Sequence, residues 1–339
     1  MRRDRMHPPA NGQQVTERME ELYRRHLLAG EERVASYYLS GQGYREPELV
    51  AEENDRFGIC IVRTLGDTYQ TGDHYQPFAL QSISKVFVYG LALADHGRDH
   101  VLEHVGVEPS GDAFNSIEFD ERNNRPHNPM VNAGALVTTD LIRGRDPTEK
   151  FERILETLRI YAGNESLAVD EDIFEAEMRT ADRNRATAYL MRSNGMVSGD
   201  VESILALYLR QCSVRVTCQD LALMAATLAN GGVNPVTGER ALPLKHVREV
   251  LSVMHTCGMY DAAGQWAFDV GVPAKSGVSG GIMAVVPGKG GIAVFSPGLD
   301  AYGNSVRGIG VCREISERLG LHVFATEAED ALLGPIESS

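Results

Sequence analysis

Ser82 and Lys85 are the two residues of this chain whose types and spacing best suit covalent chemistry. Residues three apart share one face of a helix, so Lys85 can contact the Ser82 hydroxyl if a helix begins here. A serine becomes a nucleophile when a base removes its proton, and a lysine can do this when burial lowers its pKa. The apolar run that ends at Gly97 predicts a helix over 82–96. Ser82 would lie in its first turn, where free N–H groups favour an oxyanion.

The S-x-x-K spacing is weak evidence when it stands alone, because a helix-capping serine and a solvated lysine would look the same. A second motif supports the chemical interpretation. Lys275, Ser276 and Gly277 have the K-[ST]-G form that accompanies S-x-x-K in the penicillin-recognising serine enzymes. The chain uses five lysines against 28 arginines, yet both motif positions are lysine. Arginine could not accept a proton at either position.

Composition limits the class of protein. The 339 residues are 43% hydrophobic, which is enough for a large core in one or two domains. The net charge of −14 argues against nucleic acid or an anionic membrane as a partner. Five cysteines without a C-x-x-C pair indicate a reduced chain. Residues 1–13 lack the apolar segment of a secretory signal, and no apolar run could span a membrane, so we expect a cytoplasmic protein.

Hydrophobic periodicity places strands near both ends of the chain and helices between them. The expected strands are 57–63, 68–71, 270–276, 281–286 and 291–296. Helices are expected at 15–28, 31–39, 82–96 and 305–319, and in the central region at 134–143, 148–162, 185–193, 199–210, 217–230 and 243–256.

This order predicts an α/β (α+β) fold with one antiparallel sheet built from both chain ends. Helices from the two ends would flank the sheet, and a helical domain over 98–265 would be inserted. The sheet domain would comprise 15–97 and 266–325, between a disordered tail at 1–14 and an acidic tail at 326–339. The helix that starts at Ser82 would then begin at the seam between the two domains, where pockets form.

Five longer blocks of sequence strongly resemble the serine-dependent glutaminases, which share the β-lactamase-like fold. The similarity covers about residues 20–320. The blocks are Gln-Ser-Ile-Ser-Lys-Val-Phe at 81–87, Pro-His-Asn-Pro-Met-Val-Asn-Ala-Gly-Ala at 126–135, Met-Ala-Ala-Thr-Leu-Ala-Asn-Gly-Gly at 224–232, Cys-Gly-Met-Tyr-Asp at 257–261 and Ala-Lys-Ser-Gly-Val-Ser-Gly-Gly at 274–281.

The resemblance implies hydrolysis of L-glutamine to L-glutamate and ammonia, without a metal or an organic cofactor. It also implies a homo-oligomer, either a dimer or a tetramer. Ser82 would be the nucleophile, Lys85 its base, and Tyr208 and Tyr260 candidates for proton relay. The residues that would contact the substrate are Tyr37, Ser82, Asn132, Glu177, Asn184, Tyr208, Tyr260 and Val278.

The residue types suit the substrate, since Glu177 can pair with its ammonium group while Asn and Tyr donors hold its carboxylate. The Ser82 and Val278 N–H groups would hold the oxyanion. Tyr37 is the least secure of these assignments, because Tyr38 stands beside it.

One expected motif of the wider superfamily is missing from its usual place. An S-x-N or Y-x-N sequence should lie between the other two motifs, but the Y-x-N of Tyr302, Gly303 and Asn304 follows both. We interpret it as a turn, with Tyr208 or Tyr260 as the functional substitute. Two other functions stay open at this point: another serine acyl hydrolase of the penicillin-recognising type, or a non-catalytic protein that binds an amino acid.

Two further patterns have plain structural explanations. His96, His100 and His104 have the spacing of a metal-binding helix face, but Gly97 interrupts that helix. We interpret them as an exposed helix end. The glycine-rich sequence at 288–291 could form a phosphate loop, but no strand–loop–helix pattern surrounds it, so a hairpin turn is expected.

Overall fold

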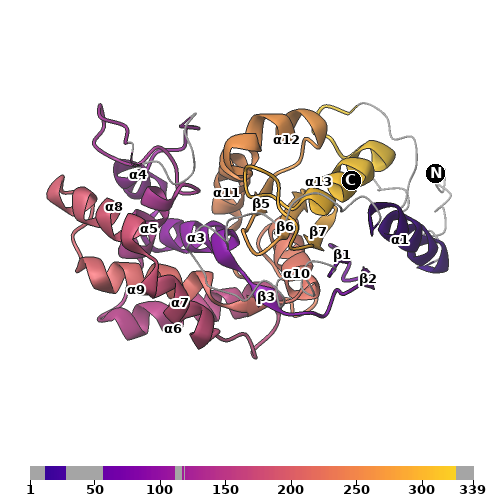
Figure 1. Ribbon diagram of the computed structural model, residues 1–339, viewed down its shortest axis with the longest axis horizontal. Helices are drawn as coiled ribbons and strands as arrows, with labels where there is room; N and C mark the ends of the chain where they lie inside the picture. Colours follow the sequence, from indigo (N-terminus) through magenta and orange to yellow (C-terminus); the bar gives the residue numbers. More distant parts are fainter. Residues whose placement is uncertain (1–11, 28–55, 111–116, 118, 326–339) are drawn as a thin grey trace, which may run out of the picture.

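A five-stranded antiparallel sheet lies at the centre of the computed structural model, which describes residues 12–27, 56–110, 117 and 119–325 (Figure 1). The strand order is β2-β1-β7-β6-β5. Two strands come from the N-terminal part of the chain and three from the C-terminal part, which confirms a sheet built from both ends. The bounds are β1 Gly58–Arg63, β2 Thr68–Gly72, β5 Ala274–Ser276, β6 Gly281–Val286 and β7 Gly290–Phe295.

Both faces of the sheet are covered, because successive side chains of a strand point to opposite faces. Ile59 and Ile61 of β1 join a core with α1 (Gly12–Leu27) and α13 (Val306–Leu319). Cys60 and Val62 point the other way, toward α10 (Cys218–Ala229). The strands of β6 and β7 are buried along their whole length, as expected for the middle of a covered sheet.

In Figure 1 the helices α3 to α9 lie beside the sheet, on the side away from α1, whereas α10 covers one face of the sheet. All six helices predicted for the central region are confirmed within about three residues at each end. The structure adds three short helices or helical segments that the sequence analysis did not separate: α4, α7 and α12. The bounds are α4 Arg98–His104, α5 Asn132–Leu141, α6 Pro147–Ala162, α7 Glu171–Arg179, α8 Asp182–Ser193, α9 Val201–Cys212, α11 Leu244–Cys257 and α12 Ala263–Asp269.

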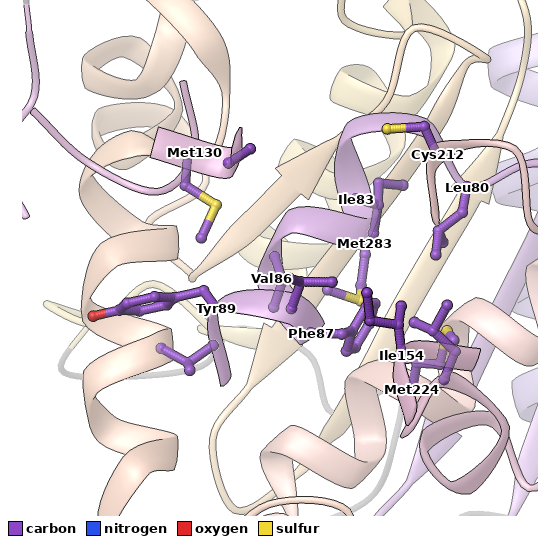
Figure 2. Close-up of a cluster of buried hydrophobic side chains, with 14 of the residues drawn as sticks. Leu80, Ile83, Val86, Phe87, Tyr89, Met130, Ile154, Cys212, Met224 and Met283 are labelled. Carbon is purple, nitrogen blue, oxygen red and sulfur yellow. The ribbon is translucent and has the colours of Figure 1, made fainter. Parts of the chain in front are cut away.

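The helix α3 (Ser84–His96) is the element that joins these parts. It is buried on nearly every side, so it reads as apolar all round rather than amphipathic. Figure 2 shows its Phe87 near Ile154 of α6 and Met283 of β6, and all three belong to one core cluster. A helix held from both sides has little freedom to move, so it can carry a reactive group at its start.

The start of this helix differs from the prediction. Residues Gln81–Ile83 form one 3₁₀ turn, and the α-helix begins at Ser84 rather than Ser82. The backbone of Gln81 is left-handed, with a φ of 51°, so the helical segment cannot extend farther toward the N-terminus. Just before the turn, the short strand β3 (Phe78–Ala79) pairs with β4 (Arg215–Val216), which anchors the approach to Ser82.

Of two predictions for the C-terminal strands, one is only partly correct and the other is confirmed. The strand expected over 270–276 is shorter and begins at Ala274, because Pro273 has no N–H to donate to a neighbouring strand. The hairpin turn at 288–291 is confirmed, since Val286 pairs with Gly290 across it.

The helix expected at 31–39 lies outside the described residues, and the division into domains stays a prediction. Within the described residues, no helix is long and apolar enough to cross a membrane.

Candidate active site

Lys85 is completely buried in the first turn of α3. Its Nζ donates hydrogen bonds to the Met130 carbonyl at 3.1 Å and to Asn132 Oδ1 at 2.7 Å. Burial lowers the pKa of Lys85 to about 8, and the nearby Cys212 opposes this only in part. A neutral amine is therefore within reach near neutral pH, which is the condition for a lysine to act as a base.

Asn132 connects three of the predicted site residues. It is the first residue of α5, and its Oδ1 accepts hydrogen bonds from Lys85 and, at 3.3 Å, from the Tyr208 hydroxyl. Its Nδ2 donates to Asn184 Oδ1 at 2.9 Å. Since Tyr208 lies on α9 and Asn184 on α8, one amide side chain joins four helices around the lysine.

Ser82 lies in the 3₁₀ turn, and only 7% of the residue is exposed to solvent. The hydrogen bonds of Lys85 Nζ go to Met130 and Asn132, and neither involves Ser82. Catalytic hydrogen bonds are often long in a ligand-free enzyme and shorten when substrate binds. Lys85 therefore follows Ser82 by three residues at the start of the helix without a hydrogen bond between the two side chains.

Glu177 approaches the same turn from α7. Gln81, the residue before Ser82, donates a hydrogen bond from Nε2 to Glu177 Oε1 at 3.2 Å. Burial raises the pKa of Glu177, and the hydrogen bond from Gln81 opposes that rise. A half-buried carboxylate with one neutral partner can still accept a cation. The sequence analysis missed the role of Gln81, although it lies within the first family block.

The K-[ST]-G motif forms the strand β5 and its end. Lys275 is fully buried, and its Nζ donates to the carbonyls of Gly258 at 2.8 Å and Ser276 at 2.7 Å. The same ammonium lies 4.0 Å from the centre of the Tyr260 ring. Burial, followed by the charge of Lys85, lowers the pKa of Lys275 well below its usual value. The two carbonyl acceptors and the Tyr260 ring nevertheless surround Lys275 Nζ with three partners that each favour a charged ammonium over a neutral amine.

Gly277 brings this strand against the turn that carries Ser82. A Cβ added at Gly277 would lie 3.1 Å from the Leu80 carbonyl and 3.4 Å from Gln81 Cβ. Val278, the next residue, packs with Tyr260 in one small apolar cluster. The Val278 backbone is therefore next to the Ser82 turn, as an oxyanion site shared by these two residues requires.

Backbone strain also marks this region. Among the described residues, the non-glycine residues with positive φ are Gln81 at 51°, Asn124 at 50° and Tyr260 at 51°. Such conformations persist only where the surrounding structure enforces them, and they gather at functional sites. Two of the three lie at the site predicted from the sequence, one directly before Ser82 and the other at a proposed proton relay.

The structure thus brings most of the predicted site residues together in two connected groups. The first contains Ser82, Lys85, Asn132, Glu177, Asn184 and Tyr208, and the second contains Tyr260 and Val278. Tyr37 lies outside the described residues. The individual roles of these side chains remain predictions. Sequence analysis did not identify Gln81 or Met130 as parts of the arrangement.

The three histidines spaced four residues apart lie on two different helices, with His96 on α3 and His100 and His104 on α4. Gly97 ends α3 after His96, and α4 begins at Arg98. Ligand atoms of His100, Glu103 and His104 lie within 4.8 Å of one another, and His100 and Glu103 are exposed. The interpretation of these histidines as an exposed helix end stays a prediction.

Comparison with known proteins identifies relatives along most of the chain. The profile of the glutaminase family matches residues 44–324. A glutaminase from Trichormus variabilis is 59% identical over 278 residues, which are 82% of this chain and 83% of that protein. A glutaminase from Clostridium tetani is 46% identical over 306 residues, covering 90% of this chain and 97% of that one.

Solved structures agree with these sequence relatives. The probable glutaminase of Bacillus subtilis superposes with a TM-score of 0.81 at 34% identity, covering 91% of this chain and 97% of that chain. Mglu in its glutamate form gives a TM-score of 0.83 at 43% identity, covering 91% of this chain and 69% of that chain. The fold class expected from the sequence is confirmed, as is the resemblance on which it partly rests. The chain belongs to the glutaminase family.

Proposed function

We propose that this protein is a glutaminase that hydrolyses the side-chain amide of L-glutamine through a glutamyl ester on Ser82. The observation that carries the proposal is a completely buried lysine with a pKa of about 8, in the helical turn that follows the serine. Membership of the glutaminase family and 59% identity to a curated glutaminase supply the substrate class.

The reaction proceeds by two acyl transfers. Ser82 Oγ forms a bond to the amide carbon while its proton passes to the neutral amine of Lys85. The N–H groups of Ser82 and Val278 hold the oxyanion that develops. The C–N bond then breaks, and the leaving nitrogen takes up a proton and departs as ammonia. Water adds to the glutamyl ester, and the release of glutamate restores the Ser82 hydroxyl.

Recognition of the free amino acid uses the carboxylate of Glu177 and the amides of Asn132 and Asn184. Glu177 pairs with the α-ammonium group, and Gln81 holds that carboxylate in place at 3.2 Å. Asn132 and Asn184 offer amide groups for the carboxylate of the substrate. Tyr208 contacts Asn132, and Tyr260 lies beside β5, so each is a candidate to move protons between Lys85 and the leaving group.

Activity measurements separate this proposal from the two alternatives. Purified protein should release ammonia and glutamate from L-glutamine, and should leave nitrocefin and p-nitrophenyl esters unchanged. Hydrolysis of those reporters without ammonia release from glutamine would favour another serine acyl hydrolase. Tight binding of glutamine without turnover would favour an amino-acid-binding protein. Either result would reject the proposed activity.

We also propose a cytoplasmic homo-oligomer without nucleic-acid or membrane partners. The compartment is supported by five cysteines that are all free, four of them buried. The absence of nucleic-acid or membrane partners is supported by the net charge of −14. The oligomeric state, dimer or tetramer, is supported by the family alone. Light scattering on the purified protein measures it directly, and a monomer at all concentrations would reject it.

A further inference from the structure

Asn304 belongs to the Y-x-N sequence that lies outside the expected motif order. It ends a tight turn in which Asp300 Oδ1 accepts the backbone N–H groups of Tyr302 and Asn304, both at 2.9 Å. The prediction of a turn is therefore confirmed. Tyr302 is 52% exposed, but Asn304 is completely buried. A buried amide in a surface turn needs partners inside the protein.

The partners of the Asn304 amide are both parts of the candidate active site. Its Oδ1 accepts a hydrogen bond from Ser276 Oγ at 2.6 Å, and Ser276 is itself completely buried. Its Nδ2 donates to the carbonyl of Met259 at 3.4 Å. Ser276 belongs to the K-[ST]-G strand, and Met259 directly precedes Tyr260. One side chain thus joins the strand that leads to Val278 with the turn that carries Tyr260.

A second set of contacts closes the same arrangement. The Tyr260 hydroxyl donates to the Ser276 carbonyl at 3.2 Å. Tyr260 and Val278 form an apolar cluster with Leu299, which precedes the Asn304 turn. A Cβ added at Gly303 would lie 3.6 Å from Val278 Cγ1 and 3.7 Å from Tyr260 Cε2. The turn therefore packs directly against both residues that Asn304 connects.

We propose that Asn304 is a positioning residue, which fixes Tyr260 relative to the Val278 backbone through Ser276 and Met259. The proposal rests on the proposed function, because it is there that Tyr260 and Val278 receive their roles. The left-handed backbone of Tyr260, with a φ of 51°, is strained and needs fixed neighbours to persist. Without the amide, the Met259–Tyr260 backbone can relax. A misplacement of about 1 Å at a reacting centre can lower the rate about 100-fold.

The test uses Asn304→Ala, Ser276→Ala and the double variant, with Asn234→Ala as a matched control. Asn234 is also completely buried, and its Nδ2 donates to the carbonyls of Ile160 and Tyr161 at 3.0 and 3.2 Å. We expect each of the two site variants to lower kcat on glutamine about 10- to 100-fold. KM should stay within about threefold of wild type, because the recognition residues Glu177 and Asn132 are untouched.

The double variant should be little slower than the slower single variant, since both substitutions break one network. The control Asn234→Ala should lower the melting temperature but keep wild-type kcat. Combined with Asn304→Ala, it should add its effect on stability without changing kcat further. Ser276→Ala removes a single hydroxyl, so it remains informative if Asn304→Ala does not fold.

Three results would overturn the inference. If wild type turns over glutamine and both site variants keep kcat within about twofold, the positioning role fails while the proposed function stands. If kcat falls in Asn234→Ala as much as in Asn304→Ala, the effect is one of general stability. If wild type releases no ammonia from glutamine, the proposed function fails first, and the positioning role fails with it.

Discussion

Replacing Lys85 with methionine should abolish turnover without weakening the fold. Methionine has a similar length and no charge, so it fills the buried position but cannot accept the Ser82 proton. Loss of a general base lowers rates by about 10²–10⁴-fold. If Lys85 had only a structural role, its replacement would instead give a less stable protein. Measuring turnover and stability together therefore separates a catalytic role of Lys85 from a structural one.

The change in stability follows from the pKa of Lys85. It falls from an ordinary 10.5 to about 8 because the ammonium is buried. This difference corresponds to a destabilisation of the folded state of about 3 kcal/mol. Because the folded pKa is the lower one, the penalty is present in full below about pH 8 and disappears as the pH rises toward 10.5.

An opposing loss comes from the hydrogen bonds that methionine cannot make. The Met130 carbonyl loses a donor, whereas Asn132 Oδ1 keeps its hydrogen bond from Tyr208. Leaving one buried acceptor without a partner costs about 1–3 kcal/mol. The two effects nearly cancel at pH 7, so we expect a stability between wild type and about 2 kcal/mol above it.

The assay is urea unfolding at pH 7 together with kcat at saturating glutamine. Lys150→Met is the matched control, because Lys150 Nζ also donates to a backbone carbonyl, that of Asp140 at 2.7 Å, but it is only half-buried and lies on α6. The control should keep wild-type kcat. A Lys85→Met protein that loses several kcal/mol of stability, or that retains kcat, would refute the reasoning.

Other substitutions and the pH profile test the remaining roles. Ser82→Ala should fold normally and lose turnover by orders of magnitude, and a normally active variant would exclude the covalent route. Glu177→Gln should lower kcat/KM on glutamine at least 100-fold, from a loss of roughly 3–5 kcal/mol; an equal loss on γ-glutamyl compounds without an α-amino group would assign Glu177 another task. Lys275→Arg should stay measurably active, because the positive charge remains, but be less stable, since a larger group enters a fully buried space; complete inactivity in a folded variant would point to proton transfer by Lys275. The kcat/KM of wild type should rise with pH and level off above about pH 8, where Lys85 is neutral; a profile that is flat between pH 6 and pH 9 would remove Lys85 as the base.

Local patterns were sufficient to predict the elements that form the sheet and most of the helices. The alternation in β1, for example, leads directly to two cores, because Ile59 and Cys60 must face opposite ways. The helix expected from residue 217 begins one residue later, at Cys218, where Thr217 and Asp220 form a capping box. The spacing of Ser82 and Lys85 was informative because a helical turn brings such residues together.

The parts that sequence could not predict depend on tertiary contacts. Nothing in the local sequence around Gln81 indicates a left-handed backbone, since glycine and asparagine are the usual signals and neither is there. The burial of Asn304 depends on Ser276 and Met259, which are distant in sequence. The helix α7 is only nine residues long and has no fully buried residue, and the sequence analysis did not separate it although Phe174 and Met178 pack against the core.

The most direct test of the account is to find which residue becomes covalently attached to the substrate. A diazoketone analogue of glutamine should inactivate the wild-type protein and add one label, which peptide mass spectrometry should locate on Ser82. Ser82→Ala should remain unlabelled, and an excess of L-glutamine should slow the labelling of wild type. A label on a cysteine such as Cys212 or Cys257, with Ser82 unmodified, would contradict the central claim.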